Sequence, residues 1–185
     1  MSIMPLQQAV QSTRAVLANV TADQLGASTP CASWNVSALI NHVVGAQHFF
    51  TAAVKGEPPS GDSVDFAAGD YLAAFDQASA ATLEALGADG IMEQILHLPF
   101  GDMPGAAVAG LAATDTFTHG WDLAKATGQS TDLAPELAAG LLAGARMSIS
   151  EGFRGPEGAP FGSTKAAPAG ASNADQLAAF LGRTV

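Results

Sequence analysis

Basic residues are scarce in this sequence. Its 185 residues include 7 Lys and Arg against 17 Asp and Glu, which gives a formal net charge of -10 at pH 7. The basic residues stand singly along the chain, so the sequence contains no basic run that would attract phosphates. We therefore expect neither nucleic acid nor an anionic membrane among the partners of this protein.

Cysteine and long apolar segments are also scarce. Cys31 is the only cysteine, so an internal disulfide is excluded, which fits a reducing compartment. No apolar segment approaches the roughly 18 residues that a transmembrane helix needs. The opening MSIMPLQQ lacks the basic start and apolar stretch of a secretion signal. These absences predict a cytoplasmic protein.

Alanine and other hydrophobic residues are abundant instead. Hydrophobic residues make up 48% of the chain and charged residues only 13%, a composition that favours closely packed helices over a sheet. The length fits one domain, and the sequence shows neither an internal repeat nor a linker. We predict an all-α fold in a single domain that spans residues 1–185.

Apolar residues at helical spacing predict five long helices, over residues 3–20, 36–54, 62–86, 106–127 and 135–151. Asn35 is the expected N-cap of the second helix, and Gly128 is expected to end the fourth. A short last helix is expected after Ser172. Residues 91–100 fit either a short extended segment or a broken turn, and we predict that they form a structured loop over one end of the bundle. The Gly-, Pro- and Ala-rich residues 152–171 are predicted to form an extended cover over the bundle.

Several ionisable residues fall on apolar helix faces. His42 lies in the apolar stripe of the second predicted helix, and Asp115, His119 and Asp122 lie in that of the fourth. Asp115 and His119 are four residues apart, a spacing that leaves their Cβ atoms about 5–6 Å apart on one helix face. Because a buried carboxylate costs several kcal/mol unless it is paired, this pattern predicts a partner such as a divalent ion.

A metal site formed by His42, Asp115 and His119 would have two imidazoles and one carboxylate. Three protein ligands leave a fourth position open, which is typical of catalytic zinc, although nickel, iron or manganese would accept the same ligands. Asp122 is predicted to accept a hydrogen bond from the second ring nitrogen of His119, with a surface position as the alternative. The alternative for the whole cluster is a helix-face ion pair beside a core histidine.

His97 is a candidate catalytic residue. It stands between Leu96 and Leu98 in the predicted loop of residues 91–100. From there it would reach the mouth of a cleft at the predicted metal site and act as an acid, a base or an anion contact.

Four segments together resemble a known family: TPCASWNVSALINHVVG, PFGDMPG, DTFTHGWDLAKATGQ and, near the end of the chain, LAAFLGR. They are similar to the N-terminal helical domain of mycothiol-dependent maleylpyruvate isomerases, and to actinobacterial metal-binding proteins of the same DinB-like four-helix-bundle superfamily. The resemblance spans nearly the whole chain. It implies a four-helix bundle with a divalent metal bound by a histidine of the second helix and an acid-x-x-x-His pair. Those positions match His42, Asp115 and His119.

The sequence departs from the isomerase in two respects. The isomerase has Glu at the acidic position, whereas this chain has Asp115, whose side chain is one methylene shorter. The isomerase also has a further C-terminal domain that contributes to its active site, whereas this chain ends with FLGRTV soon after the predicted bundle. We therefore do not expect maleylpyruvate isomerisation.

Other members of the superfamily are similar to thiol S-transferases that use mycothiol or bacillithiol. In these enzymes the metal lowers the pKa of the cofactor thiol, so that a thiolate attacks at neutral pH. The resemblance therefore implies a low-molecular-weight thiol, with mycothiol as the candidate co-substrate, and a small electrophile as the partners.

Two other functions remain open from the sequence. One is a metal-binding module without turnover, such as a sensor, and the other is a metal-dependent hydrolase in which His97 would be the base. The oligomeric state is also open, because alanine-rich helix faces suit a homodimer and a compact monomer equally.

Overall fold

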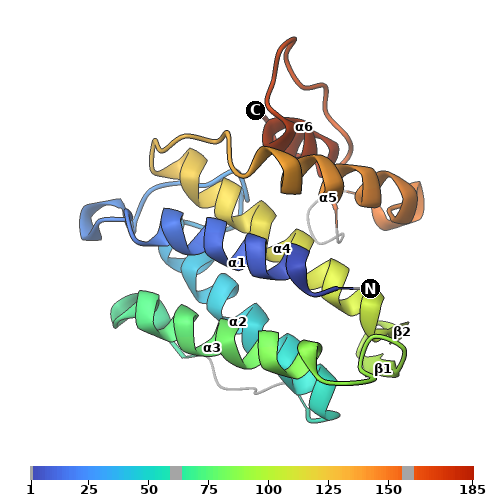
Figure 1. Cartoon of the computed structure of the whole chain (residues 1–185). Helices are drawn as coiled ribbons and strands as arrows, with labels where there is room; N and C mark the ends of the chain where they lie inside the picture. Colours follow the sequence, from blue (N-terminus) through green and yellow to red (C-terminus); the bar gives the residue numbers. More distant parts are fainter. Residues whose placement is uncertain (1, 59–63, 156–160) are drawn as a thin grey trace.

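A computed structural model describes residues 2–58, 64–155 and 161–185 of the chain (Figure 1). Most of these residues belong to six α-helices: α1 (Met4–Leu17), α2 (Val36–Lys55), α3 (Tyr71–Gly87), α4 (Gly105–Ala126), α5 (Pro135–Ser148) and α6 (Asn173–Phe180). The described residues also form one antiparallel hairpin, β1 (Ile95–Leu98) and β2 (Gly101–Pro104), and three short 3-10 helices, Ala22–Gln24, Phe66–Ala68 and Glu151–Phe153. The predicted all-α, DinB-like bundle is confirmed, and the hairpin is a small addition to it.

Four helices form the bundle. α1 lies along α4, α3 lies along α2, and α2 also contacts α4 (Figure 1). Each helix turns one apolar stripe inward, because its apolar residues recur every three or four positions. The largest fully buried side chains include Phe75 of α3 and Phe117 and Trp121 of α4. One continuous apolar core therefore holds α2 and α4 side by side.

Buried polar contacts fix how α1, α2 and α4 are aligned. Thr13 Oγ1 of α1 donates to the carbonyl of Thr116 on α4 at 2.8 Å, and Gln47 Nε2 of α2 donates to Thr116 Oγ1 at 2.8 Å. A helix that slid along its neighbour would leave these buried groups unpaired, at a cost of about 1–3 kcal/mol each. The alignment of α2 with α4 is therefore well specified.

α5 and α6 pack against each other and lie across the upper end of the bundle, where both contact α4 (Figure 1). The side chain of Ser172 accepts a hydrogen bond from the backbone N–H of Asp175 and so caps α6. Trp121 Nε1 of α4 donates to Asp175 Oδ1 at 2.9 Å, which ties α6 to the bundle.

Two predicted elements differ from the structure. The third helix, predicted over 62–86, begins only at Tyr71, because Asp70 caps it by accepting from the backbone N–H of Ala73 at 3.0 Å. Residues 62 and 63 lie outside the described residues. Residues 91–100, predicted as a loop with a short extended segment as one alternative, contain strand β1, which pairs with β2 so that Leu96 stands opposite Met103. Leu96 and Leu98 are buried, and this alternation stabilises a hairpin in place of a loop.

The predicted cover is described at residues 152–155 and 161–171, and the last helix follows Ser172 as expected. Arg154 anchors this segment: its Nη1 donates to the carbonyls of Gly162 and Phe180, and its guanidinium lies over the Phe180 ring.

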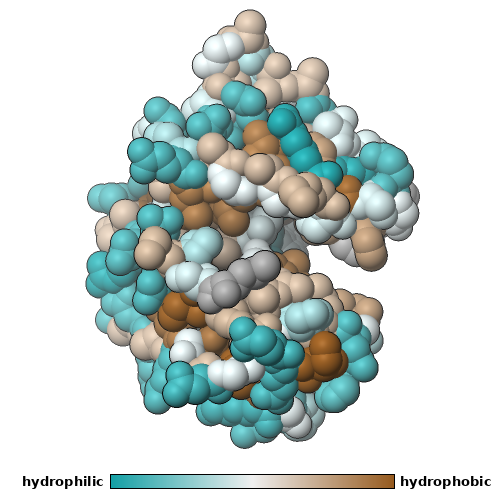
Figure 2. Space-filling view, turned by 45° about the vertical axis from the view of Figure 1, so that its right-hand side comes forward, coloured by the Kyte–Doolittle hydropathy of each residue, from teal (hydrophilic) through white to brown (hydrophobic). Residues whose placement is uncertain are grey.

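The surface shows one marked indentation, between the upper part of the molecule, which carries α5 and α6, and the part below it (Figure 2). Large exposed hydrophobic side chains are scattered over several elements: Met4, Val64, Ile95, Phe100, Met147 and Phe153. Among the described helices, none is both long enough and apolar enough to span a membrane.

Candidate metal centre

Three segments bring the candidate ligands together. α2 provides His42, and α4 provides Asp115 and His119, one helical turn apart. The loop before α2 provides Trp34, whose ring lies 4.5 Å from the His42 ring and 5.7 Å from the His119 ring, centroid to centroid. The side chain of Asn35 accepts from the backbone N–H of Ala38, which fixes the start of α2 and with it this loop.

The spacing of the ligand atoms fits one ion. Asp115 Oδ1 lies 3.5 Å from His42 Nε2 and 3.5 Å from His119 Nε2. These separations are long for a hydrogen bond. Two ligand atoms about 2.0–2.1 Å from a tetrahedral zinc ion lie about 3.3 Å apart, which is close to the separations seen here. The arrangement is therefore nearer to a ligand set than to a hydrogen-bonded cluster.

Two atoms of this cluster lack the partners that buried polar atoms need. His42 Nε2 and Asp115 Oδ2 are both buried and neither makes a hydrogen bond. Leaving such groups unpaired costs about 1–3 kcal/mol each, and more where the group is charged. A divalent ion coordinated between the two imidazoles would provide the missing interaction, so the residues fit a metal.

The cluster is partly accessible. The side chains of His42, Asp115 and His119 are 32%, 24% and 10% exposed, respectively. The sequence pattern predicted core positions for all three, whereas His42 and Asp115 lie at the edge of the core, where α2 and α4 meet solvent. The side chains around this position are therefore partly open to solvent, while the atoms His42 Nε2 and Asp115 Oδ2 themselves are buried.

The other ring nitrogen of His119 faces a second group of side chains. His119 Nδ1 lies 3.0 Å from Asp122 Oδ2, and Cys31 Sγ donates to the same oxygen at 3.2 Å. Arg183 donates to Asp122 through Nε at 3.3 Å and through Nη2 at 3.0 Å, and its Nη2 lies 3.6 Å from Cys31 Sγ. Asp122 is completely buried, so it is not the surface residue that the sequence left as an alternative.

Charge interactions in the cluster outweigh burial. Burial raises the pKa of Asp115 and lowers the pKa of His119. The attraction between the carboxylate and the imidazolium, together with the contacts that each makes with its other neighbours, outweighs burial for both groups. The pKa of Asp115 is therefore lowered, and the pKa of His119 is raised well above its usual value. For Asp122, burial raises the pKa, but the hydrogen bond from His119 and the charge of Arg183 outweigh burial, so the pKa is lowered below its usual value. Without a metal, the two carboxylates on either side of His119 therefore favour the protonated form of its ring.

Among the described residues, two groups have the composition and spacing of a metal site: His42 with Asp115 and His119, and Cys31 with His119 and Asp122. In each group the ligand atoms lie within 4.8 Å of one another. The groups share His119, which offers Nε2 to the first and Nδ1 to the second. The sequence predicted the first group only.

His97 is not brought to this cluster by any contact among the described residues. Its side chain is 78% exposed on β1, and its Nδ1 lies 2.8 Å from Asp102 Oδ1 on β2. This pair resembles a cross-strand ion pair on the hairpin surface. A catalytic role for His97 stays a prediction.

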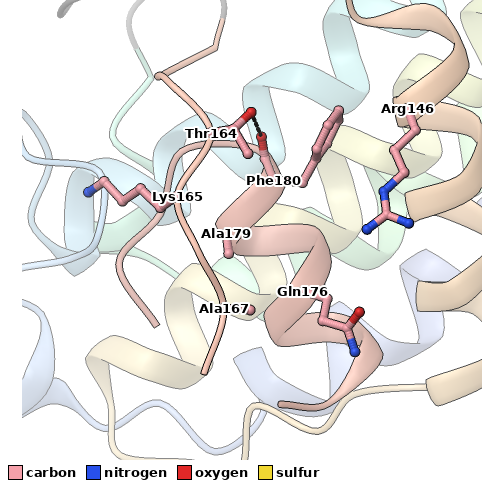
Figure 3. A pocket seen from close by; sticks show the side chains of 7 residues that line it. All are labelled: Arg146, Thr164, Lys165, Ala167, Gln176, Ala179 and Phe180. Atoms are coloured by element: carbon pink, nitrogen blue, oxygen red, sulfur yellow. Dashed lines mark hydrogen bonds between the residues drawn. The ribbon is translucent and has the colours of Figure 1, made fainter. Parts of the chain in front are cut away.

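The described residues line two surface hollows, and only one of them adjoins the cluster. One, of about 480 Å³, is lined by Ser28, Trp34 and Asn35 among others, and so adjoins the cluster through Trp34. The other, of about 120 Å³, lies between α5, α6 and the cover segment (Figure 3). Its lining includes no residue of the cluster, and the Lys165 ammonium turns away from it to donate to Thr184 Oγ1 at 2.6 Å.

Comparison with known families agrees with the sequence motifs and with the helical bundle. The family model described as mycothiol maleylpyruvate isomerase N-terminal domain matches residues 6–124. The chain belongs to this family. The match includes α1 to α3, the hairpin and nearly all of α4, and therefore His42, Asp115, His119 and Asp122.

Two relatives of this family member extend over its full length. Both come from Mycobacterium tuberculosis, strains CDC 1551 / Oshkosh and ATCC 25618 / H37Rv, and both are described as uncharacterized proteins. Each is 50% identical over 186 residues, which cover 99% of this chain and 98% of the relative. No solved structure matches the chain significantly.

Sequence reasoning did not assign the role of Arg183. This residue lies beyond the part of the chain that the isomerase N-terminal domain model matches, and it is 152 residues from Cys31, which it contacts. One local signal was present, because a lone arginine follows the apolar segment LAAFLG. Its partner, however, is set only by how α6 packs on α4.

Proposed function

We propose that this protein is a divalent-metal-dependent transferase that joins a low-molecular-weight thiol, of the mycothiol type, to a small electrophile. His42, Asp115 and His119 would hold the metal, and zinc suits this donor set best, with nickel, iron and manganese as alternatives. The observation that carries the proposal is the pair of buried, unpartnered ligand atoms, His42 Nε2 and Asp115 Oδ2. Membership of the isomerase N-terminal domain family supports the choice of thiol.

The charges around the site favour an anionic fourth ligand. Asp115 and Asp122 carry two negative charges, and Arg183 carries one positive charge beside Asp122. With a divalent ion in place and His119 neutral, this group of residues would have one positive charge in excess. A thiolate would neutralise that excess, whereas a neutral ligand would leave it uncompensated in a partly buried site.

The ion would supply the positive charge that lowers the pKa of the thiol, so that thiolate is available at neutral pH. The protein's own residues would orient the ligands and surround the ion. Asp122 accepts from His119 Nδ1 and so holds Nε2 toward Asp115. The ring of Trp34 contacts both imidazoles and so supports their positions. The body of the thiol or of the electrophile would lie in the hollow lined by Trp34.

The first test is metal content. Untagged protein purified without chelator should contain about one equivalent of a divalent ion by elemental analysis, and His42→Ala and Asp115→Ala should contain almost none. His48→Ala is the matched control, because His48 lies on the same helix but stacks on Phe66 away from the cluster. A wild-type protein that takes up no metal after reconstitution overturns the metal site.

The second test is thiol transfer. With mycothiol and 1-chloro-2,4-dinitrobenzene, the thiol loses its proton, a C–S bond forms and chloride leaves, so the conjugate is followed by its absorbance. Activity should depend on the metal, and His119→Ala should abolish it while His48→Ala retains it. Metal binding without conjugation of any electrophile in a chemically diverse panel would favour a binding module in place of a transferase.

A further inference from the structure

His119 stands between two cation-binding positions. On its Nε2 side lie His42 and Asp115, and on its Nδ1 side lie Cys31 and Asp122. The second group has the separations of a ligand set: Nδ1 to Oδ2 is 3.0 Å, Sγ to Oδ2 is 3.2 Å and Sγ to Nδ1 is 3.9 Å. Thiolate, imidazole and carboxylate around a tetrahedral zinc ion lie about 3.3–3.6 Å apart. By composition this second group would bind zinc well, because it includes a thiolate.

The guanidinium of Arg183 already serves as the cation of this second group. It donates to both carboxylate oxygens of Asp122 and to the Cys31 sulfur. The Arg183 side chain is only 14% exposed, and Asp122 is not exposed at all, so the pair is held in place away from bulk water. An arginine keeps its charge at any ordinary pH and its planar fork matches a carboxylate, so it is a permanent occupant.

We propose that Arg183 keeps divalent metal out of the Cys31, His119 and Asp122 position and thereby directs it to the Nε2 side of His119. A metal ion and the guanidinium would need the same lone pairs of Asp122 and Cys31, and two cations there would repel each other at short range. The inference rests on the proposed function for the other site. According to this proposal, the C-terminal segment determines where the metal binds, although it lies beyond the matched family domain.

This selection has a chemical consequence. Metal bound on the Nδ1 side would have a cysteine thiolate as a ligand, beside the buried side chains of His119 and Asp122. Metal on the Nε2 side would instead lie beside His42 and Asp115, whose side chains are 32% and 24% exposed at the edge of the bundle. Arg183 therefore keeps the ion where an external thiol can reach it, and it keeps Cys31 as an unmetallated thiol.

Cobalt(II) spectroscopy of the full-length protein tests this proposal. Cobalt replaces zinc in tetrahedral sites, and only a thiolate ligand gives an intense near-ultraviolet sulfur-to-cobalt charge-transfer band. Wild-type protein should bind about one equivalent of cobalt with d–d bands but without that charge-transfer band. Arg183→Met and Arg183→Gln should acquire the band, and Cys31→Ser in the Arg183→Met background should abolish it.

Arg146→Met is the matched control, since it removes the same charge from an exposed position on α5 outside both groups, and it should give the wild-type spectrum. Circular dichroism establishes that each variant is folded. Two different substitutions at Arg183 are used so that the test still holds if one of the two variants does not fold. A charge-transfer band in the wild type, or its absence in both folded Arg183 variants, overturns the proposal. If wild type binds no cobalt and the Arg183 variants bind it through Cys31, the proposed transferase site fails while the role of Arg183 stands.

Discussion

At the scale of single residues, His119 is the residue that the two groups of possible metal ligands share. Its Nε2 faces Asp115 and its Nδ1 faces Asp122, so one imidazole ring is held between two carboxylates. The ring orientation is set by contacts from both sides, which is the arrangement by which proteins fix the tautomer of a metal-binding histidine. A substitution on the Nδ1 side of the ring should therefore change the affinity for metal, even though the substituted residue would not contact the ion.

Asp122→Asn is the substitution that tests this coupling. Asparagine can still accept from His119, but it removes the negative charge and leaves the guanidinium of Arg183 unbalanced beside the site. Zinc affinity should fall by about 10–100-fold, measured by competition with a chromophoric chelator. Asp89→Asn, at an exposed position after α3, removes the same charge and should leave the affinity unchanged. Equal affinity in wild type and Asp122→Asn would contradict this reading.

At the scale of elements, α4 is the helix on which both the site and the fold depend. It contacts α1, α2, α5 and α6, and it carries Asp115, His119 and Asp122. Its contact with α1 is close at Gly120, next to His119. A Cβ atom at Gly120 would meet Thr13 Oγ1 and would lie 3.1 Å and 3.2 Å from Thr13 Cβ and Cα.

Two glycine substitutions on α4 should therefore have opposite effects. Gly120→Ala should lower the free energy of unfolding by about 1–3 kcal/mol, because α1 must shift to accommodate the methyl group. Gly110→Ala, where a Cβ meets nothing within 4 Å, should raise it by up to about 1 kcal/mol through better helix propensity. Urea unfolding followed by circular dichroism measures both, and a Gly120→Ala protein as stable as Gly110→Ala would show that the α1–α4 contact is not tight.

The link between α4 and α6 should depend on pH. Burial raises the pKa of Asp175, but hydrogen bonds from Trp121, Thr131 and Ser172 outweigh it and lower that pKa below its usual value. A carboxyl whose pKa is lower in the folded state stabilises the fold above its unfolded pKa of about 3.9, and that stabilisation is lost as the pH falls through the folded value.

Asp175→Asn should accordingly unfold more easily than wild type at pH 7, and the difference should narrow as the pH falls below about 4. Thermal unfolding at a series of pH values measures it. A difference that stays constant down to the acid limit would mean that the charge of Asp175 contributes nothing to the α4–α6 link.

At the scale of the whole molecule, metal binding should be visible as stability. The site joins α2 to α4, so an ion bound only by the folded protein adds to the free energy of unfolding. At a free zinc concentration about 100 times the dissociation constant, that addition is about 2.7 kcal/mol. For a protein of this size it corresponds to a rise in Tm of about 5–10 °C.

Thermal melts with zinc and with chelator should show this rise and its reversal. His119→Ala should show no rise, while His48→Ala should behave as the wild type. A zinc effect of equal size in His119→Ala would place the ion elsewhere on the molecule.

The sequence by itself determined most of the helix positions and the family, and it predicted one of the two groups of side chains around His119. Helix positions follow from a 3.6-residue period that is written locally, and caps such as Asn35 follow from side-chain chemistry within a few residues. The Asp115–His119–Asp122 spacing is likewise local, because residues three and four apart share a helix face. His42 was added to the set by its own apolar stripe and by the family motif.

Only the tertiary structure decided which side chains surround Asp115, His119 and Asp122. The contacts of Cys31 and Arg183 with Asp122 join residues 91 and 61 positions apart, and no local period encodes such contacts. The position of His97 on a hairpin, paired with Asp102, likewise depends on strand register. Periodicity specifies which face of a helix turns inward, but packing of the whole chain decides which two faces meet, and so which side chains stand on each side of His119.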